Sequence, residues 1–304
     1  MKKYFIAIAV AAVSLASCSE KVEPVNGTDE VKYVPVEIAS VEIPATKAVV
    51  SGTGFSDGAS IGTFLYQEKT NTAYYTGSTN VEYSKGSSGW TSTTPLKVSA
   101  TKGDLYAYYP YKDGVTDITS ISITNAEDWM YAEKKTIDNS SASVSLTMKH
   151  ALAYVEVTIK KTTDYVGTAN LSMITFSTAP SSNKPTIAAS GTLNAKAGTV
   201  SGTAEDVSFY VGSDSGAEIT TSGYTHDCLF IPTAENSNRQ AVKLTFTIGG
   251  KDKSINLTGT SGVKFASGVK STVTITLSPK GLTLDSVAIT DWTTGTSSSG
   301  TIDS

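Results

Sequence analysis

The stretch Ala151-Leu152-Ala153-Tyr154-Val155-Glu156-Val157-Thr158-Ile159-Lys160 shows most directly how this chain folds. Its odd-numbered positions carry Ala, Val or Ile, and from Glu156 onward the even-numbered positions are polar. Alternation with a period of two is typical of a strand that buries one face. Similar segments recur along the chain, whereas amphipathic segments at helical spacing are nearly absent. The sequence therefore predicts an all-β fold with antiparallel strands.

Further candidate strands extend over most of the chain. They are residues 61–67, 73–75, 81–84, 96–100, 104–109, 143–148, 171–178, 187–194, 206–211, 225–231, 242–248, 253–257, 272–277 and 287–290. One helical turn is expected at residues 125–130, with Asn125 as its cap. A boundary at residues 162–168 divides the strands into two groups. This division favours two β-sandwich domains in series with Greek-key type connections, residues 48–165 and 166–304.

The N-terminus has the pattern of a bacterial lipoprotein signal. Lys2 and Lys3 precede an apolar run, residues 5–12, and Leu15-Ala16-Ser17-Cys18 closes the leader. The apolar run is too short for a membrane-spanning helix, and it ends in small residues that signal peptidases accept. Residues 1–17 are therefore predicted to be removed, leaving an acylated Cys18 (palmitate among its lipids) that anchors the chain to a membrane. An ordinary secretory leader is the alternative.

Residues 18–47 are predicted to form a tether followed by an edge strand. Within residues 31–43 apolar and polar positions largely alternate, with changes of phase near Pro35 and Ser40. Because Pro35 has no N–H to donate, it favours an edge position. An exposed loop is expected to follow around Lys47.

Charge and chemistry argue against several function classes. The chain has 24 basic and 28 acidic residues, and without residues 1–17 the net charge becomes −6, which disfavours nucleic acid as a partner. Cys228 has no expected disulfide partner and is interpreted as a buried strand residue. His226 lies on the same strand face, but no third group completes a nucleophilic site. The spacing of His150 and His226 does not suit zinc, so no enzyme, cofactor or metal is predicted.

Aromatic residues admit two interpretations. The cluster Tyr106-Ala107-Tyr108-Tyr109-Pro110-Tyr111 describes either a strand with both faces covered or exposed rings that stack on sugars. The structural interpretation is favoured. The other belongs to a competing hypothesis, a permanently lipid-anchored glycan-binding surface protein that uses exposed tyrosines or Trp90.

Several motifs, in their order and spacing, resemble the fimbrillin family of Bacteroidales, the major and minor pilins of type V pili. They are Cys18 with its lipobox, Leu105-Tyr106-Ala107-Tyr108-Tyr109-Pro110-Tyr111, Asp128-Trp129-Met130-Tyr131-Ala132, Met148-Lys149-His150-Ala151-Leu152-Ala153, Phe265-Ala266-Ser267-Gly268 before Thr272-Val273-Thr274-Ile275-Thr276-Leu277, and Ile289-Thr290-Asp291-Trp292.

The resemblance implies two transthyretin-like sandwiches, export as an outer-membrane lipoprotein, and assembly into a surface fimbrium by donor-strand exchange. In the family, a protease removes the N-terminal segment with its first strand, and a strand of a neighbouring subunit fills the groove. The corresponding removable strand here carries Val31, Tyr33, Val36, Ile38, Val41 and Ile43. Family members are commonly cut after Arg, but Arg239 is the only arginine of this chain. The expected cut is therefore between Lys47 and Ala48, although Lys47 is also compatible with an ordinary surface lysine.

The carboxyl end leaves the subunit's place in a pilus open. A donor strand needs alternating apolar residues, and residues 293–300 have none. Val287 and Ile289 are the candidates for donation, while Trp292 is either a core plug or an anchor of the donated segment. Shaft, tip and anchor roles all stay open, with a tip or accessory subunit favoured. The predicted function is adhesion, and the expected partners are other pilins, a processing protease and the outer membrane before cleavage; the receptor is not identified.

Overall fold

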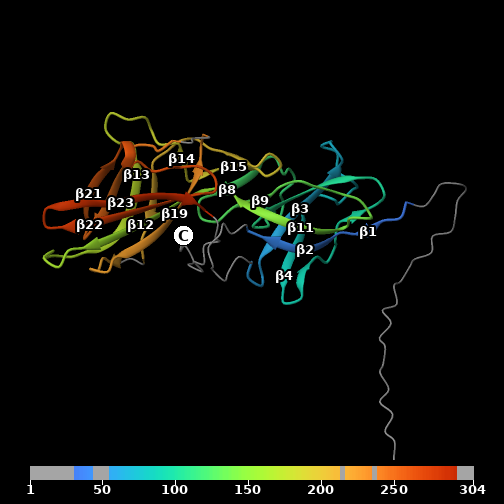
Figure 1. Cartoon of the computed structure of the whole chain (residues 1–304), viewed down its shortest axis with the longest axis horizontal. Helices are drawn as coiled ribbons and strands as arrows, with labels where there is room; N and C mark the ends of the chain where they lie inside the picture. Colours follow the sequence, from blue (N-terminus) through green and yellow to red (C-terminus); the bar gives the residue numbers. More distant parts are fainter. Residues whose placement is uncertain (1–30, 44–54, 213–215, 235–237, 293–304) are drawn as a thin grey trace, which may run out of the picture. The chain divides into compact units, whose positions relative to one another are not determined.

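The computed structural model describes all residues except 1–30, 44–54, 213–215, 235–237 and 293–304 (Figure 1). The chain divides into two units, residues 1–32 and 33–304, and the elements below belong to the second. The described residues contain strands, turns and one short 3₁₀ helix (Gly259–Ser261), but no α-helix. None of their helices could span a membrane. The predicted all-β fold is confirmed.

The first large sheet has eight strands. In spatial order they are β2 (Glu37–Glu42), β11 (Ser143–His150), β9 (Met130–Ala132), β7 (Gly103–Tyr109), β3 (Ser60–Gln67), β4 (Val81–Gly86) and β5 (Gly89–Thr91), with β10 (Lys135–Ile137) also paired to β7. The terminal strand β2 also lies close to β5, at the other end of this path, so the sheet curves round on itself. A two-stranded sheet, β1 (Val34–Pro35) with β6 (Lys97–Val98), adds to this part.

Two five-stranded sheets follow. One has the order β14 (Ile187–Ala188), β19 (Tyr224–Pro232), β12 (Ala153–Lys161), β22 (Val269–Ser278) and β23 (Gly281–Asp291). The other has the order β17 (Val207–Tyr210), β13 (Asn170–Ser177), β20 (Val242–Ile248) and β21 (Lys251–Leu257), with β18 (Ala217–Glu218) also paired to β13. Val155 and Val157 of β12 share one buried cluster with Ile174 and Phe176 of β13, as in a β-sandwich.

Several central strands bury both faces. In β7, Leu105 belongs to the hydrophobic core of the first large sheet, while Tyr106 on the opposite face belongs to a second cluster. In β12, Val155 faces the sandwich core and Tyr154 joins the same second cluster as Tyr106. Residues from both halves of the sequence therefore share one buried aromatic cluster, and the halves are packed together.

A three-stranded sheet reinforces this connection. It pairs β8 (Ile121–Thr124) with β15 (Ser190–Asn194), and β15 with β16 (Thr199–Ser201). The proposed division at residue 165 remains a prediction. β12, which precedes that position, forms its ladders with β19 and β22 of the later sequence.

Two local expectations were wrong. Residues 125–130 do not form a helical turn. A hydrogen-bonded turn of the chain leads instead into β9, which pairs with β7 and β11. This strand pairing outweighs a helical signal only six residues long. The strands are also not all antiparallel, since β2 pairs in parallel with β11, and β12 with β22. These partners lie far apart in sequence, so no hairpin fixes their direction.

Gly191 provides a test of the sheet that joins the halves. A Cβ at this position would lie 2.2 Å from the backbone carbonyl oxygen of Ser201, which cannot move without displacing β16. We expect Gly191→Ala to lower the free energy of unfolding by about 1–3 kcal/mol in urea denaturation. Gly86→Ala is the control, because the nearest atom to its added Cβ is 3.9 Å away. Equal decreases in the free energy of unfolding in the two variants would contradict the close packing at Gly191.

Candidate functional site

The segment of residues 34–43 bridges two strands that do not pair with each other. Its first part, β1, is antiparallel to β6, with Val34 opposite Val98. Its second part, β2, runs parallel to β11, and Figure 1 shows these two strands side by side. The sequence-based expectation of an edge position agrees with the structure, because β2 is the terminal strand of its sheet. One short segment thus completes two separate strand edges.

Val36 marks the point where the segment changes partner. Its N–H donates to the carbonyl oxygen of Leu96 at 2.7 Å, and the next N–H, that of Glu37, donates to Ala142 at 2.9 Å. The Tyr83 hydroxyl donates to the carbonyl oxygen of Val36 at 2.9 Å and accepts from the N–H of Leu96 at 3.0 Å. Burial raises the pKa of Tyr83 to about 12, against the opposing effect of the Leu96 N–H. The hydroxyl therefore stays protonated and can donate at neutral pH.

Four side chains of the segment are inserted in the core. Val36, Ile38, Val41 and Ile43 are each at most 6% exposed and belong to one hydrophobic cluster. Burying such side chains contributes roughly 1.5–3 kcal/mol each, or about 6–12 kcal/mol for the four as an upper estimate. The segment is therefore an integral part of this core rather than a surface addition.

A bulge keeps these four residues on the same side. Val144 lies opposite Ile38, but Ser145 lies opposite Ser40, so Ala39 is an extra, exposed residue. The extra residue shifts the alternation from positions 36 and 38 to positions 41 and 43. The change of phase expected near Ser40 thus corresponds to this irregularity.

The remaining predicted residues of the N-terminal region differ in their surroundings. Val31 and Tyr33 are 59% and 47% exposed, so they do not share the burial of the other four. Cys18, Lys47 and Ala48 lie outside the described residues. Lipid attachment and cleavage at these positions stay predictions.

The carboxyl-terminal candidates Val287 and Ile289 lie on β23. This strand ends its sheet and pairs with β22 from Gly281 to Asp291, with Val287 opposite Val273. Val287 and Ile289 are half-buried, and Val287 packs against the sandwich core. In the isolated chain, both residues are therefore held within their own sheet.

Trp292 is buried directly after β23. Its ring stacks on His150 with a centroid separation of 3.6 Å, and its backbone N–H donates to the carbonyl oxygen of Gly268 at 2.7 Å. His150 Nδ1 in turn hydrogen-bonds to Asp128 Oδ1 at 2.9 Å. Burial raises the pKa of Asp128, although His150 acts in the opposite direction. Trp292 thus contacts residues of the first half, an arrangement that the sequence pattern alone did not indicate.

The aromatic alternatives are resolved by burial. Tyr106 and Tyr108 are at most 5% exposed and lie in the cluster shared by both halves. The interpretation as a strand with both faces covered is confirmed. Trp90 is 8% exposed and packs edge-on against Phe55, so it does not offer a free face to a sugar.

The residues considered for catalysis do not form a reactive site. Cys228 is fully buried in β19, as expected, and burial raises the pKa of its thiol well above the usual value. The thiolate that nucleophilic chemistry needs is therefore disfavoured. Within the described part of the chain, no group of His, Cys, Asp and Glu is arranged to hold a metal ion.

Removing one hydroxyl tests the crossover at Val36. We expect Tyr83→Phe to lower the free energy of unfolding by about 1–3 kcal/mol, since the carbonyl of Val36 and the N–H of Leu96 each lose a buried partner. Urea denaturation measures the effect. Tyr106→Phe is the control, because in the described structure the Tyr106 hydroxyl has no hydrogen-bond partner. If the free energy of unfolding falls no further in Tyr83→Phe than in Tyr106→Phe, the bridging role of Tyr83 is contradicted.

Comparison with solved structures identifies chains of similar fold. A proposed cell adhesion protein from Bacteroides ovatus ATCC 8483 is 16% identical, with a TM-score of 0.60 over 86% of this chain and 98% of that chain. A second proposed cell adhesion protein, from Bacteroides uniformis ATCC 8492, is 20% identical, with a TM-score of 0.57 over 79% of this chain and 93% of that chain. At these identities the likeness concerns the fold alone.

Sequence comparison supplies the family. No significant match was found among curated proteins. The model of a family described as fimbrillin-like matches residues 46–292, which include nearly all strands of the eight-stranded sheet and of the two five-stranded sheets. The match begins after the bridging segment and ends at Trp292. This chain therefore belongs to the fimbrillin-like family.

Proposed function

We propose that this chain is a structural subunit of a cell-surface pilus, exported as a lipoprotein through Cys18 and assembled by donor-strand exchange for adhesion. The observation that carries the proposal is the position of residues 34–43. They form a terminal strand that satisfies two strand edges and fills a core at the same time. They also precede Lys47, where we place the proteolytic cut.

Loss of this segment creates a defined vacancy. The ladder edges of β6 and β11 that face β1 and β2 lose their backbone partners, and the Tyr83 hydroxyl loses the Val36 carbonyl. The space of four apolar side chains opens beside them. Unpaired backbone groups next to an apolar trough are costly until another strand supplies both hydrogen bonds and side chains. A strand from a neighbouring subunit meets both needs.

Proteolysis gives the process a direction. Before the cut, the segment is tethered to the chain and fills its own groove, so an incoming strand has no free site. After the cut, the segment can dissociate and a tethered donor from the next subunit can remain. Hydrolysis of one peptide bond thus converts a closed monomer into an acceptor of the next subunit.

The carboxyl end favours a tip or accessory position. Donation of Val287 or Ile289 requires β23 to leave β22, to which it pairs over ten register positions. It also disturbs Trp292, which stacks on His150. This chain is therefore better equipped to receive a strand than to give one. Its proposed partners are other pilin subunits and a processing protease, with lipid contact to the outer membrane before cleavage.

Substitution of the proposed cleavage residue tests the mechanism in the native host. We expect Lys47→Ala to leave the N-terminal segment attached and to prevent assembly, because the groove stays filled. The measurement is an immunoblot of surface protein, without boiling, for the mass of the subunit and for higher assemblies. The wild-type chain is expected to be shorter and assembled.

Lys32→Ala is the matched control, since Lys32 precedes the bridging segment and is exposed. Its processing and assembly are expected to match those of the wild type. Normal assembly of Lys47→Ala without cleavage would contradict the requirement for removal of the segment. Cleavage at another residue before β3, followed by assembly, would contradict only the position of the cut.

A further inference from the structure

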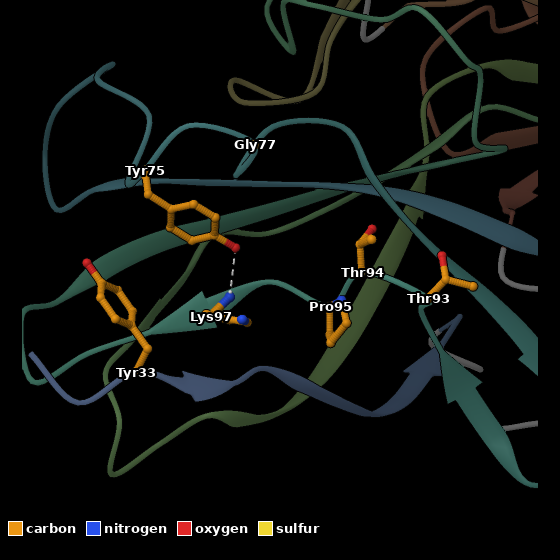
Figure 2. A pocket seen from close by; sticks show the side chains of 7 residues that line it. All are labelled: Tyr33, Tyr75, Gly77, Thr93, Thr94, Pro95 and Lys97. Carbon is orange, nitrogen blue, oxygen red and sulfur yellow. Dashed lines mark hydrogen bonds between the residues drawn. The ribbon is translucent and has the colours of Figure 1, made fainter. Parts of the chain in front are cut away.

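A hollow on the surface of the first half combines two tyrosine rings with polar groups. It has a volume of about 560 Å³ and is lined by Tyr33, Tyr75, Gly77, Thr93, Thr94, Pro95 and Lys97. Figure 2 shows the ring of Tyr33 on the N-terminal segment below Tyr75, with Lys97 beside them under the Tyr75 hydroxyl. The ring centroids are 6.3 Å apart and the planes meet at 74°. The two rings thus form an angled aromatic wall.

Tyr75 is held in place by the backbone. Its hydroxyl oxygen accepts a hydrogen bond from the N–H of Lys97 at 2.9 Å, which Figure 2 marks with a dashed line. The hydroxyl hydrogen remains available to donate to another group. Tyr33, by contrast, is 47% exposed and presents much of its ring to the surface. One tyrosine is therefore a fixed polar contact and the other an accessible apolar platform.

A second hollow of about 520 Å³ continues from the first. Both are lined by Gly77, Thr93 and Thr94, and the second adds mainly polar residues, among them Thr79, Glu82, Ser84 and Thr91. In the described part of the chain, the hydroxyls of Thr79, Thr91 and Thr93 have no intramolecular hydrogen-bond partner. The two hollows share three lining residues and form one groove, here called the tyrosine-threonine groove, which combines tyrosine rings with unpaired threonine hydroxyls.

The charges of the groove balance. Lys97 at one end and Glu82 in the second hollow form no ion pair with another described residue, although the Ser84 hydroxyl donates to Glu82 at 3.3 Å. One positive and one negative side chain give no overall preference for a polyanion. The predicted mature chain is itself acidic, which further disfavours an acidic polymer.

These features match the chemistry of a neutral sugar chain. The C–H faces of a pyranose ring stack on aromatic faces, while its hydroxyl groups need many small donors and acceptors. Cavities of this size class hold small ligands, with a few placed polar groups that fix orientation. We propose that the tyrosine-threonine groove binds a neutral oligosaccharide, with Tyr33 as the stacking platform and the threonine hydroxyls as hydrogen-bond partners.

The N-terminal segment links this site to processing. Tyr33 precedes Lys47, whereas every other lining residue follows it. If the proposed cleavage occurs, the groove loses its exposed platform and keeps its polar part. This consequence rests on the proposed function, but the sugar site itself does not. The uncleaved subunit is therefore expected to bind the oligosaccharide more tightly than the cleaved one.

The test uses the full chain purified from a host without the processing protease, with intact mass confirming that Tyr33 is retained. Native gels containing mannan, laminarin, arabinoxylan or polygalacturonate report binding as slower migration. We expect retardation by at least one of the three neutral polysaccharides. Tyr33→Ala and Thr93→Ala should each weaken it at least fivefold. Tyr210→Ala is the matched control, because Tyr210 is 81% exposed and belongs to β17, outside the groove.

Three outcomes overturn the proposal. They are retardation by none of the four polysaccharides, preference for polygalacturonate, and unchanged binding in both groove variants. Because the protein in this experiment is never cleaved, none of these outcomes bears on strand exchange. Conversely, a chain that binds a neutral polysaccharide through Tyr33 but is never processed in its host would leave the sugar site intact and remove the proposed assembly mechanism.

Discussion

The structure of the first half depends on the pairing of one N-terminal segment with two strand edges. Residues 34–43 supply hydrogen bonds to β6 and β11 and place four apolar side chains between them. Water can hydrogen-bond to the exposed strand edges, but it does not fill an apolar trough favourably, and an exposed edge invites pairing with another strand. The same contacts that stabilise the monomer therefore define what a replacement strand must provide.

The strands that bury both faces hold the rest of the chain together through contacts that do not involve this segment. β7 and β12 bury residues on both sides, and the aromatic cluster that contains Tyr106 and Tyr154 contains no residue of the N-terminal segment. Trp292, stacked on His150, adds a contact across this cluster. The segment belongs to the core that contains Leu65 and Leu105, so its loss affects one core of three.

Sequence periodicity predicted the strands whose burial is one-sided or clearly alternating. β20 occupies residues 242–248 as expected, and the phase change near Ser40 corresponds to the bulge at Ala39. The alternation pattern did not predict the structure where pairing with distant strands decides it. β9 formed where a helical turn was expected, and the parallel partners of β2 and β12 are set by long-range packing. Sequence alone also could not bring Tyr33 to Tyr75, because their contact requires β1 to lie beside β6.

The central claim is that residues 34–43 are a temporary occupant of their groove. The most direct measurement is the N-terminal sequence and intact mass of the protein recovered from the surface of its native host. The account predicts a chain that begins at Ala48, without Cys18 and without the segment that bridges β6 and β11. A chain that begins at lipidated Cys18 in every surface fraction, including the assembled one, would contradict it.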